Sequence, residues 1–346
     1  MISTDSINST IAPTVLLGGT LQLKTPNPPI VEFAKKGTMF VGTFGSGVTT
    51  TDIVVGTATS IQTVTMPVAD KWIGICYHPK VNKFFLTGFT SANAYTSTDG
   101  LTWTALVNGV DLPQSVANTV PVAGGDCVTF VPRVTASTAA TYGLIFDDLS
   151  MIYVVGNSIQ GSTSRAAIST ASDDTRAIWI GNGNLYWNVS GIDVVAATSS
   201  PQSIGSPVSM SGTAALALAG ERFIIVNAAI VYVSTFVKTG LGTTVTYTLP
   251  ITPNNFCVLV DGSSYTILSQ NSTSVYQSGD YGVTWSALPL TGIDKSAVFY
   301  GATMLGSTPI VFTSLGVYLG AVGGGVKVIP QYVSTTPGQK YVVKAK

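Results

Sequence analysis

The sequence predicts an all-β fold built from many short strands joined by tight turns. Of its 346 residues, 36 are glycine and 9% are charged, and Thr, Ser and Val are abundant. That composition favours strands and turns over helices. In addition, one local pattern returns along the chain: an apolar strand, a short polar or glycine turn, and a second apolar strand. No shift in composition marks a boundary, so we expect one domain over residues 1–346.

The recurring hairpin appears six times, and the residues between its strands are typical turn formers. In chain order the strand pairs are Ile30–Phe33 with Thr38–Phe44, Trp72–Tyr77 with Lys83–Phe89, Tyr142–Phe146 with Ser150–Val155, Ala214–Ala219 with Arg222–Asn227, Asn255–Val260 with Ser264–Leu268, and Ala297–Tyr300 with Thr308–Thr313. A further strand follows most of them. The turn Asn182-Gly183 adds the alternative of an extra hairpin between 177–181 and 184–189, because Asn-Gly favours two-residue hairpin turns.

One stretch in the last third of the chain has the sequence of a strand, a polar turn and a second strand. Ser278, Asp280 and Gly282 form the turn, because short polar side chains accept bonds from nearby backbone N–H groups and Gly permits φ > 0. Thr284 and Trp285 then restore strand propensity. These residues resemble the Asp box, S-x-D-x-G-x-T-W, of sialidases and other β-propellers.

The Asp-box motif returns twice in altered form. A version one residue shorter consists of Ser97, Asp99, Gly100, Thr102 and Trp103. An eroded version keeps Ser172, Asp174 and Trp179, with Arg176 in the place of Gly and Ile178 in the place of Thr. In the family the box joins the third and fourth strands of a blade and is structural. The resemblance therefore implies a single β-propeller whose boxes support the fold.

The spacing of the hairpins predicts six blades, with seven as the alternative. Three of the five spacings between successive second strands are about 42–45 residues, the period of propeller repeats. We interpret the two wider gaps as insertions near 104–125 and 177–212, where loops would reach neighbours. Strands from the two chain ends should close the ring, with segment 1–29 either closing it or extending toward neighbours. The candidate closing strands are Thr14–Leu23 or Val31–Phe33 with Val326–Ile329 or Tyr341–Lys344.

The charged residues argue against the sialidase activity that the resemblance would otherwise suggest. As the family implies, a sialidase site needs three arginines, a Tyr–Glu nucleophile pair and an Asp general acid. The four arginines are Arg133, Arg165, Arg176 and Arg222, and none precedes the first box. Glu221 is the only glutamate in the later chain and lies in a predicted hairpin turn. We therefore interpret the chain as non-enzymatic.

No cofactor or metal site is expected. The single His78 has Cys76 two residues before it, but no further His or Cys nearby to complete a metal site. Gly323-Gly324-Gly325 is not followed by the Lys-Ser/Thr of a phosphate loop. Cys76, Cys127 and Cys257 lie in apolar strand patterns without close spacing, so we interpret them as buried free thiols.

Charge and hydropathy limit the partners. The formal net charge is +0, which argues against nucleic acid and anionic membranes, since both select a basic excess. The most apolar run, 214–237, is interrupted by Gly220-Glu221-Arg222 and by Asn227, so no membrane insertion is expected. The first residues lack the features of a signal peptide, and we expect synthesis in a host cytoplasm.

The charge-poor, Thr-, Ser-, Gly- and Val-rich composition resembles that of bacteriophage virion proteins, particularly tail, nozzle and fibre components. We therefore interpret the chain as a structural or adhesive virion component, homo-oligomeric or present in several copies, in contact with other virion proteins. One alternative is a glycan- or receptor-binding propeller that recognises a host surface glycan, with Tyr186 and Trp187 stacking on a sugar ring. Another is an Asp-box assembly factor.

Overall fold

The computed structural model describes residues 22–24, 28–112, 115–124, 127–132, 140–147, 150–158, 170–172, 176–181, 184–189, 202–203, 214–219, 222–237, 240–241, 244–290 and 292–320. These residues form 29 strands and one 3-10 turn, Gly45–Gly47, so the predicted all-β class is confirmed. Within the described ranges, no helix has the length and apolar character of a membrane span.

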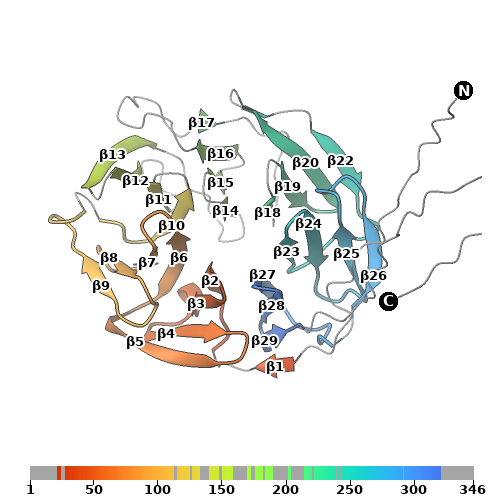
Figure 1. Cartoon of the computed structure of the whole chain (residues 1–346), viewed down its shortest axis with the longest axis horizontal. Coiled ribbons are helices and arrows are strands. Elements are labelled where there is room, and N and C mark those ends of the chain that lie inside the picture. Colours follow the sequence, from red (N-terminus) through yellow and green to blue (C-terminus); the bar gives the residue numbers. More distant parts are fainter. Residues whose placement is uncertain are drawn as a thin grey trace, which may run out of the picture.

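The strands pair into seven antiparallel sheets arranged as a ring (Figure 1). The first two sheets contain β2 (Glu32–Lys36), β3 (Met39–Thr43), β4 (Thr50–Thr57) and β5 (Ile61–Asp70), then β6 (Trp72–His78), β7 (Lys83–Gly88), β8 (Ala94–Ser97) and β9 (Thr104–Leu106). The next two contain β10 (Thr119–Gly124), β11 (Cys127–Pro132), β12 (Ala140–Asp147) and β13 (Ser150–Ser158), then β14 (Thr170–Ser172), β15 (Arg176–Gly181), β16 (Asn184–Val189) and β17 (Gln202–Ser203).

The fifth sheet contains β18 (Ala214–Ala219), β19 (Arg222–Asn227), β20 (Ile230–Val237), β21 (Gly240–Leu241) and β22 (Val245–Thr248). The sixth contains β23 (Cys257–Asp261), β24 (Ser264–Leu268), β25 (Ser274–Ser278) and β26 (Ser286–Pro289). The seventh contains β27 (Phe299–Leu305), β28 (Thr308–Thr313), β29 (Gly316–Leu319) and β1 (Gln22–Lys24). The first strand of every sheet contacts the first strand of the next, so the inner strands form a closed circle.

Strand β1 closes the ring from the N-terminal side. It pairs antiparallel with β29 in the register Gln22↔Leu319 and Lys24↔Val317, and so becomes the outer strand of the last sheet. A short strand from the start of the chain, which overlaps one of the candidate closing strands, therefore completes the last sheet. Its partner is β29 and neither of the later candidates, which lie outside the described residues.

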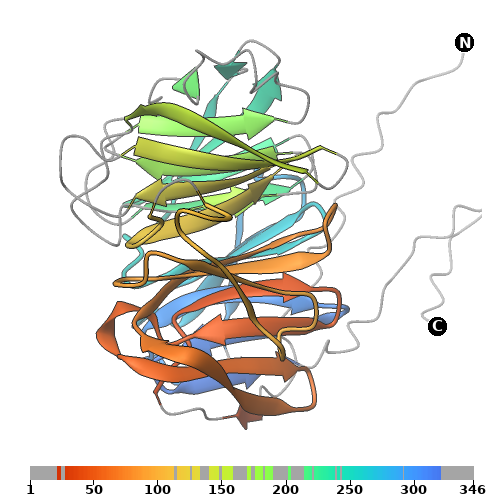
Figure 2. The same cartoon turned by 90° about the vertical axis from the view of Figure 1, so that its left-hand side faces the viewer.

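The strands run roughly along the ring axis, as the edge-on view shows (Figure 2). Because neighbouring strands alternate in direction, the first-to-second and third-to-fourth connections of every sheet reach the same edge of the ring. We call this the turn edge. The second-to-third connections and the links between sheets reach the opposite edge.

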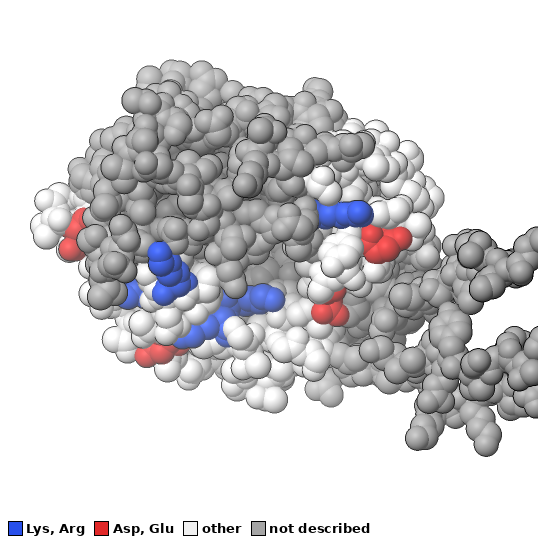
Figure 3. All heavy atoms as spheres, turned by 45° about the horizontal axis from the view of Figure 1, so that its top comes forward, with Lys and Arg blue, Asp and Glu red and all other residues white. Residues whose placement is uncertain are grey.

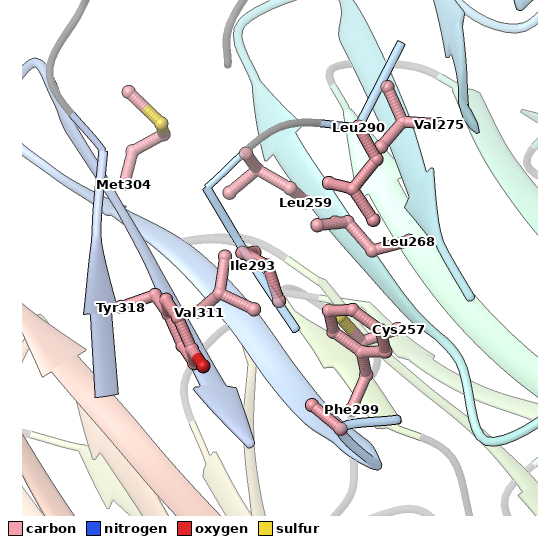
Figure 4. Close-up of a cluster of buried hydrophobic side chains, with 11 residues drawn as sticks. Cys257, Leu259, Leu268, Val275, Leu290, Ile293, Phe299, Met304, Val311 and Tyr318 are labelled. Atoms are coloured by element: carbon pink, nitrogen blue, oxygen red, sulfur yellow. The ribbon is translucent and has the colours of Figure 1, made fainter. Parts of the chain in front are cut away.

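The core lies between neighbouring sheets. In one cluster, Cys257, Leu259 and Leu268 of the sixth sheet pack against Val311 and Tyr318 of the seventh (Figure 4). Equivalent clusters join the first sheet to the second and the fifth to the sixth. Where these clusters are described, neighbouring sheets therefore bury their faces against each other, which is the physical reason for the ring.

The described strands correct the two predicted insertions and bear on the number of blades. Six blades were favoured with seven as the alternative, and the described strands form seven sheets. The range 104–125 contains β9 and β10, and 177–212 contains most of β15 with β16 and β17. The extra hairpin at Asn182-Gly183 belongs to the fourth sheet, with register Gly181↔Asn184. This hairpin was predicted only as an alternative because the first and last strands of its sheet are only three and two residues long and leave little pattern in the sequence.

Candidate functional site

The turn edge holds the residues of two predicted Asp boxes, in two turns with the same hydrogen-bonding scheme. The first serine–aspartate turn, Ser97–Trp103, joins β8 to β9, and the second, Ser278–Trp285, joins β25 to β26. In both sheets these are the third and fourth strands. The position of both turns therefore matches what the resemblance implied.

In the first turn, Ser97 and Asp99 hold the backbone in place. Ser97 Oγ donates to Asp99 Oδ1 (2.9 Å) and accepts from the N–H of Gly100 (2.8 Å). Asp99 Oδ1 also accepts from the N–H groups of Thr102 (2.9 Å) and Leu101 (2.8 Å), and these bonds hold the pKa of the Asp99 carboxyl below its ordinary value. Trp103 Nε1 donates to the Gly100 carbonyl at 2.9 Å.

The second turn repeats the scheme with one more residue. Ser278 Oγ donates to Asp280 Oδ1 (2.8 Å) and accepts from Gly282 N–H (2.7 Å). Thr284 gives Asp280 two bonds, from its N–H (2.9 Å) and its hydroxyl (2.6 Å). Burial works to raise the pKa of Asp280, but these bonds outweigh it, so the pKa lies below its ordinary value. Trp285 Nε1 donates to the Gly282 carbonyl at 2.9 Å.

Both turns dock on the preceding sheet through a glycine in the left-handed region. A Cβ added to Gly100 (φ +74°) would lie 2.7 Å from Val41 Cγ2 of β3. A Cβ added to Gly282 (φ +84°) would lie 2.9 Å from Val233 Cγ2 of β20. Only glycine satisfies both the backbone conformation and the close approach. The two turns are therefore contacts between neighbouring sheets as well as connections within a sheet.

Tyr281 is the additional residue of the second turn. Its φ is +59°, and its N–H donates to the carbonyl of Ser263 at 2.9 Å. The side chain is 39% exposed, and the guanidinium carbon of Arg222, from the preceding sheet, lies 5.8 Å from the ring centroid. A bulky residue with positive φ is uncommon and points to strain or a special role.

Exposed apolar side chains surround Tyr281. Val283, in the same turn, is 52% exposed. Val245 of β22 is 56% exposed and pairs with Val233, whose side chain faces Gly282. We call Tyr281, Val283 and Val245 the tyrosine patch. The carboxylates of Asp261, at the β23–β24 turn, and Asp280 lie on the turn edge of the same sheet.

Four lysines gather on another part of the turn edge. Lys35 and Lys36 end β2, Lys80 lies in the β6–β7 turn, and Lys83 begins β7; we call them the lysine patch. Lys36 Nζ donates to the carbonyl of Thr98 in the first turn at 2.6 Å. In Figure 3 most of the blue of the described Lys and Arg side chains lies on the left of the face shown, with some red of Asp and Glu beside it, and both colours appear on the right.

The sequence prediction missed the lysine patch. Its members are far apart in the chain and come together only because first-to-second connections of neighbouring sheets meet at one edge. The signal that could have found them is positional: lysines flank the same turn in two consecutive hairpins.

The third, eroded box is corrected by the topology. Ser172 ends β14 and Trp179 lies inside β15, the first and second strands of the fourth sheet, and Asp174 lies outside the described residues. A box would join the third and fourth strands. The match arose because Ser and Asp also favour ordinary hairpin turns.

Tyr186 and Trp187 lie in strand β16 and not in a loop, which corrects their proposed place. They pair with Trp179 and Ile178, respectively. Successive positions of a strand belong to opposite faces of the sheet.

The remaining candidates give no site. Cys257 is buried and Cys76 half-buried, and burial raises the pKa of the Cys257 thiol; Cys127 lies in β11. His78 is buried at the end of β6. Among the described residues no group of three His, Cys, Asp or Glu side chains could hold a metal ion. Gly323-Gly324-Gly325 lies outside the described ranges.

No protein-family model and no curated protein matches the sequence. Several solved structures match the fold. Virginiamycin B lyase from Staphylococcus aureus matches with 11% identity and a TM-score of 0.60, over 87% of this chain and 98% of its own. YCF48 from Cyanidioschyzon merolae matches with 15% identity and a TM-score of 0.57, over 86% and 97%. The chain has the β-propeller fold. Identities this low establish the fold alone, and YCF48 has also been solved with a bound D1 peptide.

The interpretation of the chain as non-enzymatic is contradicted by these comparisons. Virginiamycin B lyase is an enzyme, and its propeller matches this one over most of both chains. The interpretation depended on the absence of one arginine and glutamate set. That absence concerns sialidase chemistry alone and says nothing of the other reactions that a propeller can support.

Proposed function

We propose that this β-propeller is a structural or adhesive component of a bacteriophage virion, present in several copies and bound to other virion proteins through its turn edge. Its place would be the virion, after synthesis in the host cytoplasm. The charge-poor composition supports this, because few charges need to be desolvated when such a surface is permanently covered.

The observation that carries the proposal is the combination of rigid turns and exposed apolar side chains on the turn edge. Each serine–aspartate turn is fixed by hydrogen bonds of 2.6–3.4 Å and by its contact with the preceding sheet. Even so, the first turn exposes Leu101 (47%) and the second exposes Tyr281 and Val283. Apolar side chains held on a rigid edge are suited to a permanent protein contact.

We also infer that the two turns are Asp boxes. Their positions between third and fourth strands, the bonds from Ser and Asp to the turn backbone, and the Trp–Gly bond support this assignment. The proposed role of the boxes is structural, and the candidate contact surface consists of the residues that they expose.

The experiment is mass spectrometry of density-purified particles from the source that encodes the chain. We expect peptides of the chain in the banded particles, at several copies for each particle and resistant to a high-salt wash. Detection only in the soluble fraction of the lysate would contradict the proposal. Antibody labelling of the particles would then locate the chain within the virion.

A further inference from the structure

We propose that the lysine patch of one copy of this chain docks on the tyrosine patch of a second copy. The inference deepens the proposed function, because it names one partner of the turn edge, and it rests on the presence of several copies. Its starting point is the conformation of Tyr281.

Tyr281 occupies the left-handed region, where a bulky residue is disfavoured. The first serine–aspartate turn forms the same contacts without a residue at this position. The fold therefore does not require an aromatic side chain here, and the ring is 39% exposed. A strained, exposed Tyr with an Arg stacked on it has the composition of a protein-binding hot spot.

The tyrosine patch has an acidic border. Asp261 is exposed, and Asp280 is held in its ionised form by the bonds from Thr284 and Ser278. Arg222 is the one cation that the structure describes beside this patch, and its guanidinium faces the Tyr281 ring. An apolar centre with carboxylates around it suits a partner surface that is apolar and basic.

The lysine patch has the complementary character. The four ammonium groups come from two neighbouring hairpins; that of Lys35 donates to the carbonyl of Met304 in the seventh sheet (3.3 Å) and that of Lys36 to the first turn. Among the described residues Asp99 is the acid on this part of the edge. The Asp99 carboxylate is occupied by its own turn. Lys36 lies against the first turn, which exposes Leu101. Basic side chains beside an exposed Leu match the acidic and apolar character of the tyrosine patch.

The two patches lie on different sides of one edge, over the first and second sheets and over the fifth and sixth. Two copies that face each other through this edge, related by a two-fold axis, bring each lysine patch onto the other's tyrosine patch. The contact is then made twice, as an isologous interface requires.

The experiment measures the mass of the purified full chain by light scattering and sedimentation over a range of concentrations, at low and at high salt. We expect a dimer at low salt whose dissociation constant rises at high salt, because the lysine–carboxylate pairs are screened. Lys80→Glu with Lys83→Glu should weaken the dimer by about tenfold or more. Val110→Ser, which changes an 81% exposed side chain in the link between the second and third sheets, on the opposite edge, is the matched control and should leave the mass unchanged.

A charge swap makes the test specific. Asp261→Lys alone should also weaken the dimer, whereas an equimolar mixture of Asp261→Lys with the Lys80→Glu/Lys83→Glu variant should form a mixed dimer. In that mixture one interface pairs Glu with Lys and the other keeps the original pairing. Tyr281→Asn should weaken association while the melting temperature stays equal or rises, because Asn tolerates positive φ. Loss of association through misfolding would instead lower the melting temperature.

Three results would overturn the inference. The protein could be a monomer at every concentration, the lysine substitutions could leave the dissociation constant of the dimer unchanged, or the mixture of variants could form no mixed dimer. If the monomer is retained on dextran sulfate and the lysine changes release it, the patch binds an anionic polymer and the inference is wrong. A monomer that is nevertheless found in particles refutes only this contact. Absence from particles refutes the proposed function, whatever the mass in solution.

Discussion

The first and second serine–aspartate turns connect equivalent strands with loops that differ by one residue. In the shorter turn Ser97 bonds the N–H three residues on, and in the longer one Ser278 bonds the N–H four residues on. Both end with a Trp that donates to the turn Gly at 2.9 Å. The two turns therefore have in common the glycine contact with the preceding sheet and the buried Trp. The segment from the Asp to the Gly differs in length, and its additional residue, Tyr281, occupies the left-handed region.

If the Trp anchors are what the two turns share, their loss should be the most costly change. Trp103→Ala and Trp285→Ala should each lower the free energy of unfolding by about 3–5 kcal/mol, because both side chains are buried between sheets. Denaturant unfolding of each variant measures this. Leu101→Ala, at an exposed position, is the control and should change stability little. Near-native stability of both Trp variants would show that the turns are not anchored through these rings.

The glycines should come next. Gly100→Ala and Gly282→Ala should each cost about 2–4 kcal/mol, because the new Cβ combines left-handed strain with a clash against a valine of the preceding sheet. Gly262→Ala distinguishes the left-handed strain from the clash, since Gly262 has φ +56° and no atom within 4 Å of its Cβ position. It should cost only about 1 kcal/mol. If denaturant unfolding gave the same loss in free energy of unfolding at all three positions, the clash with the preceding sheet would not contribute.

The aspartates should have smaller effects that depend on pH. Asp280→Ala and Asp99→Ala should each cost about 1–2 kcal/mol near neutral pH through lost turn bonds. Because the folded-state pKa of both carboxyls is lowered, their contribution is present above the unfolded pKa and is lost as pH falls below about 4. Unfolding at a series of pH values should show the variants and the wild type converging in acid. A constant difference down to pH 3 would contradict this explanation.

The extra residue of the second turn should give the smallest change, with the opposite sign. Tyr281→Asn should stabilise the fold by up to about 1 kcal/mol, since Asn tolerates the left-handed region and the lost stacking with Arg222 is worth about 0.5–1 kcal/mol. Thermal unfolding tests this, with Tyr281→Phe as the control that keeps both the strain and the ring. A destabilised Asn variant would mean that the Tyr side chain supports the fold.

The local parts of the fold could be predicted from the sequence, and the tertiary parts could not. All six hairpins and both serine–aspartate turns could be predicted because turn residues and strand periodicity act within about ten residues. The central hairpin of the fourth sheet was predicted only as an alternative, because outer strands as short as Gln202–Ser203 leave no pattern. The buried Asp70 was also missed: it accepts bonds from Lys71, Thr90 and Ser91, and only the folded chain brings the last two to it.

Of the candidate site, only the two serine–aspartate turns could be predicted. Their Ser, Asp, Gly and Trp residues can be recognised in the sequence because their spacing is local. The lysine patch depends on which turns share an edge, and the tyrosine patch depends on exposure, which the sequence does not reveal. Tyr186 and Trp187 were placed in an insertion because the hairpin that contains strand β16 was predicted only as an alternative.

The equivalence of the two turns can be tested directly by exchanging one for the other. Residues Ser278–Trp285 are replaced by the seven residues of Ser97–Trp103, which removes Tyr281 and shortens the loop by one residue. The free energy of unfolding of this chimera is then measured by denaturant titration. If the glycine contact and the Trp anchor are the fixed elements, the chimera folds with a stability within about 1 kcal/mol of wild type. A chimera that loses more than about 3 kcal/mol, or does not fold, would show that each turn is specific to its own pair of sheets.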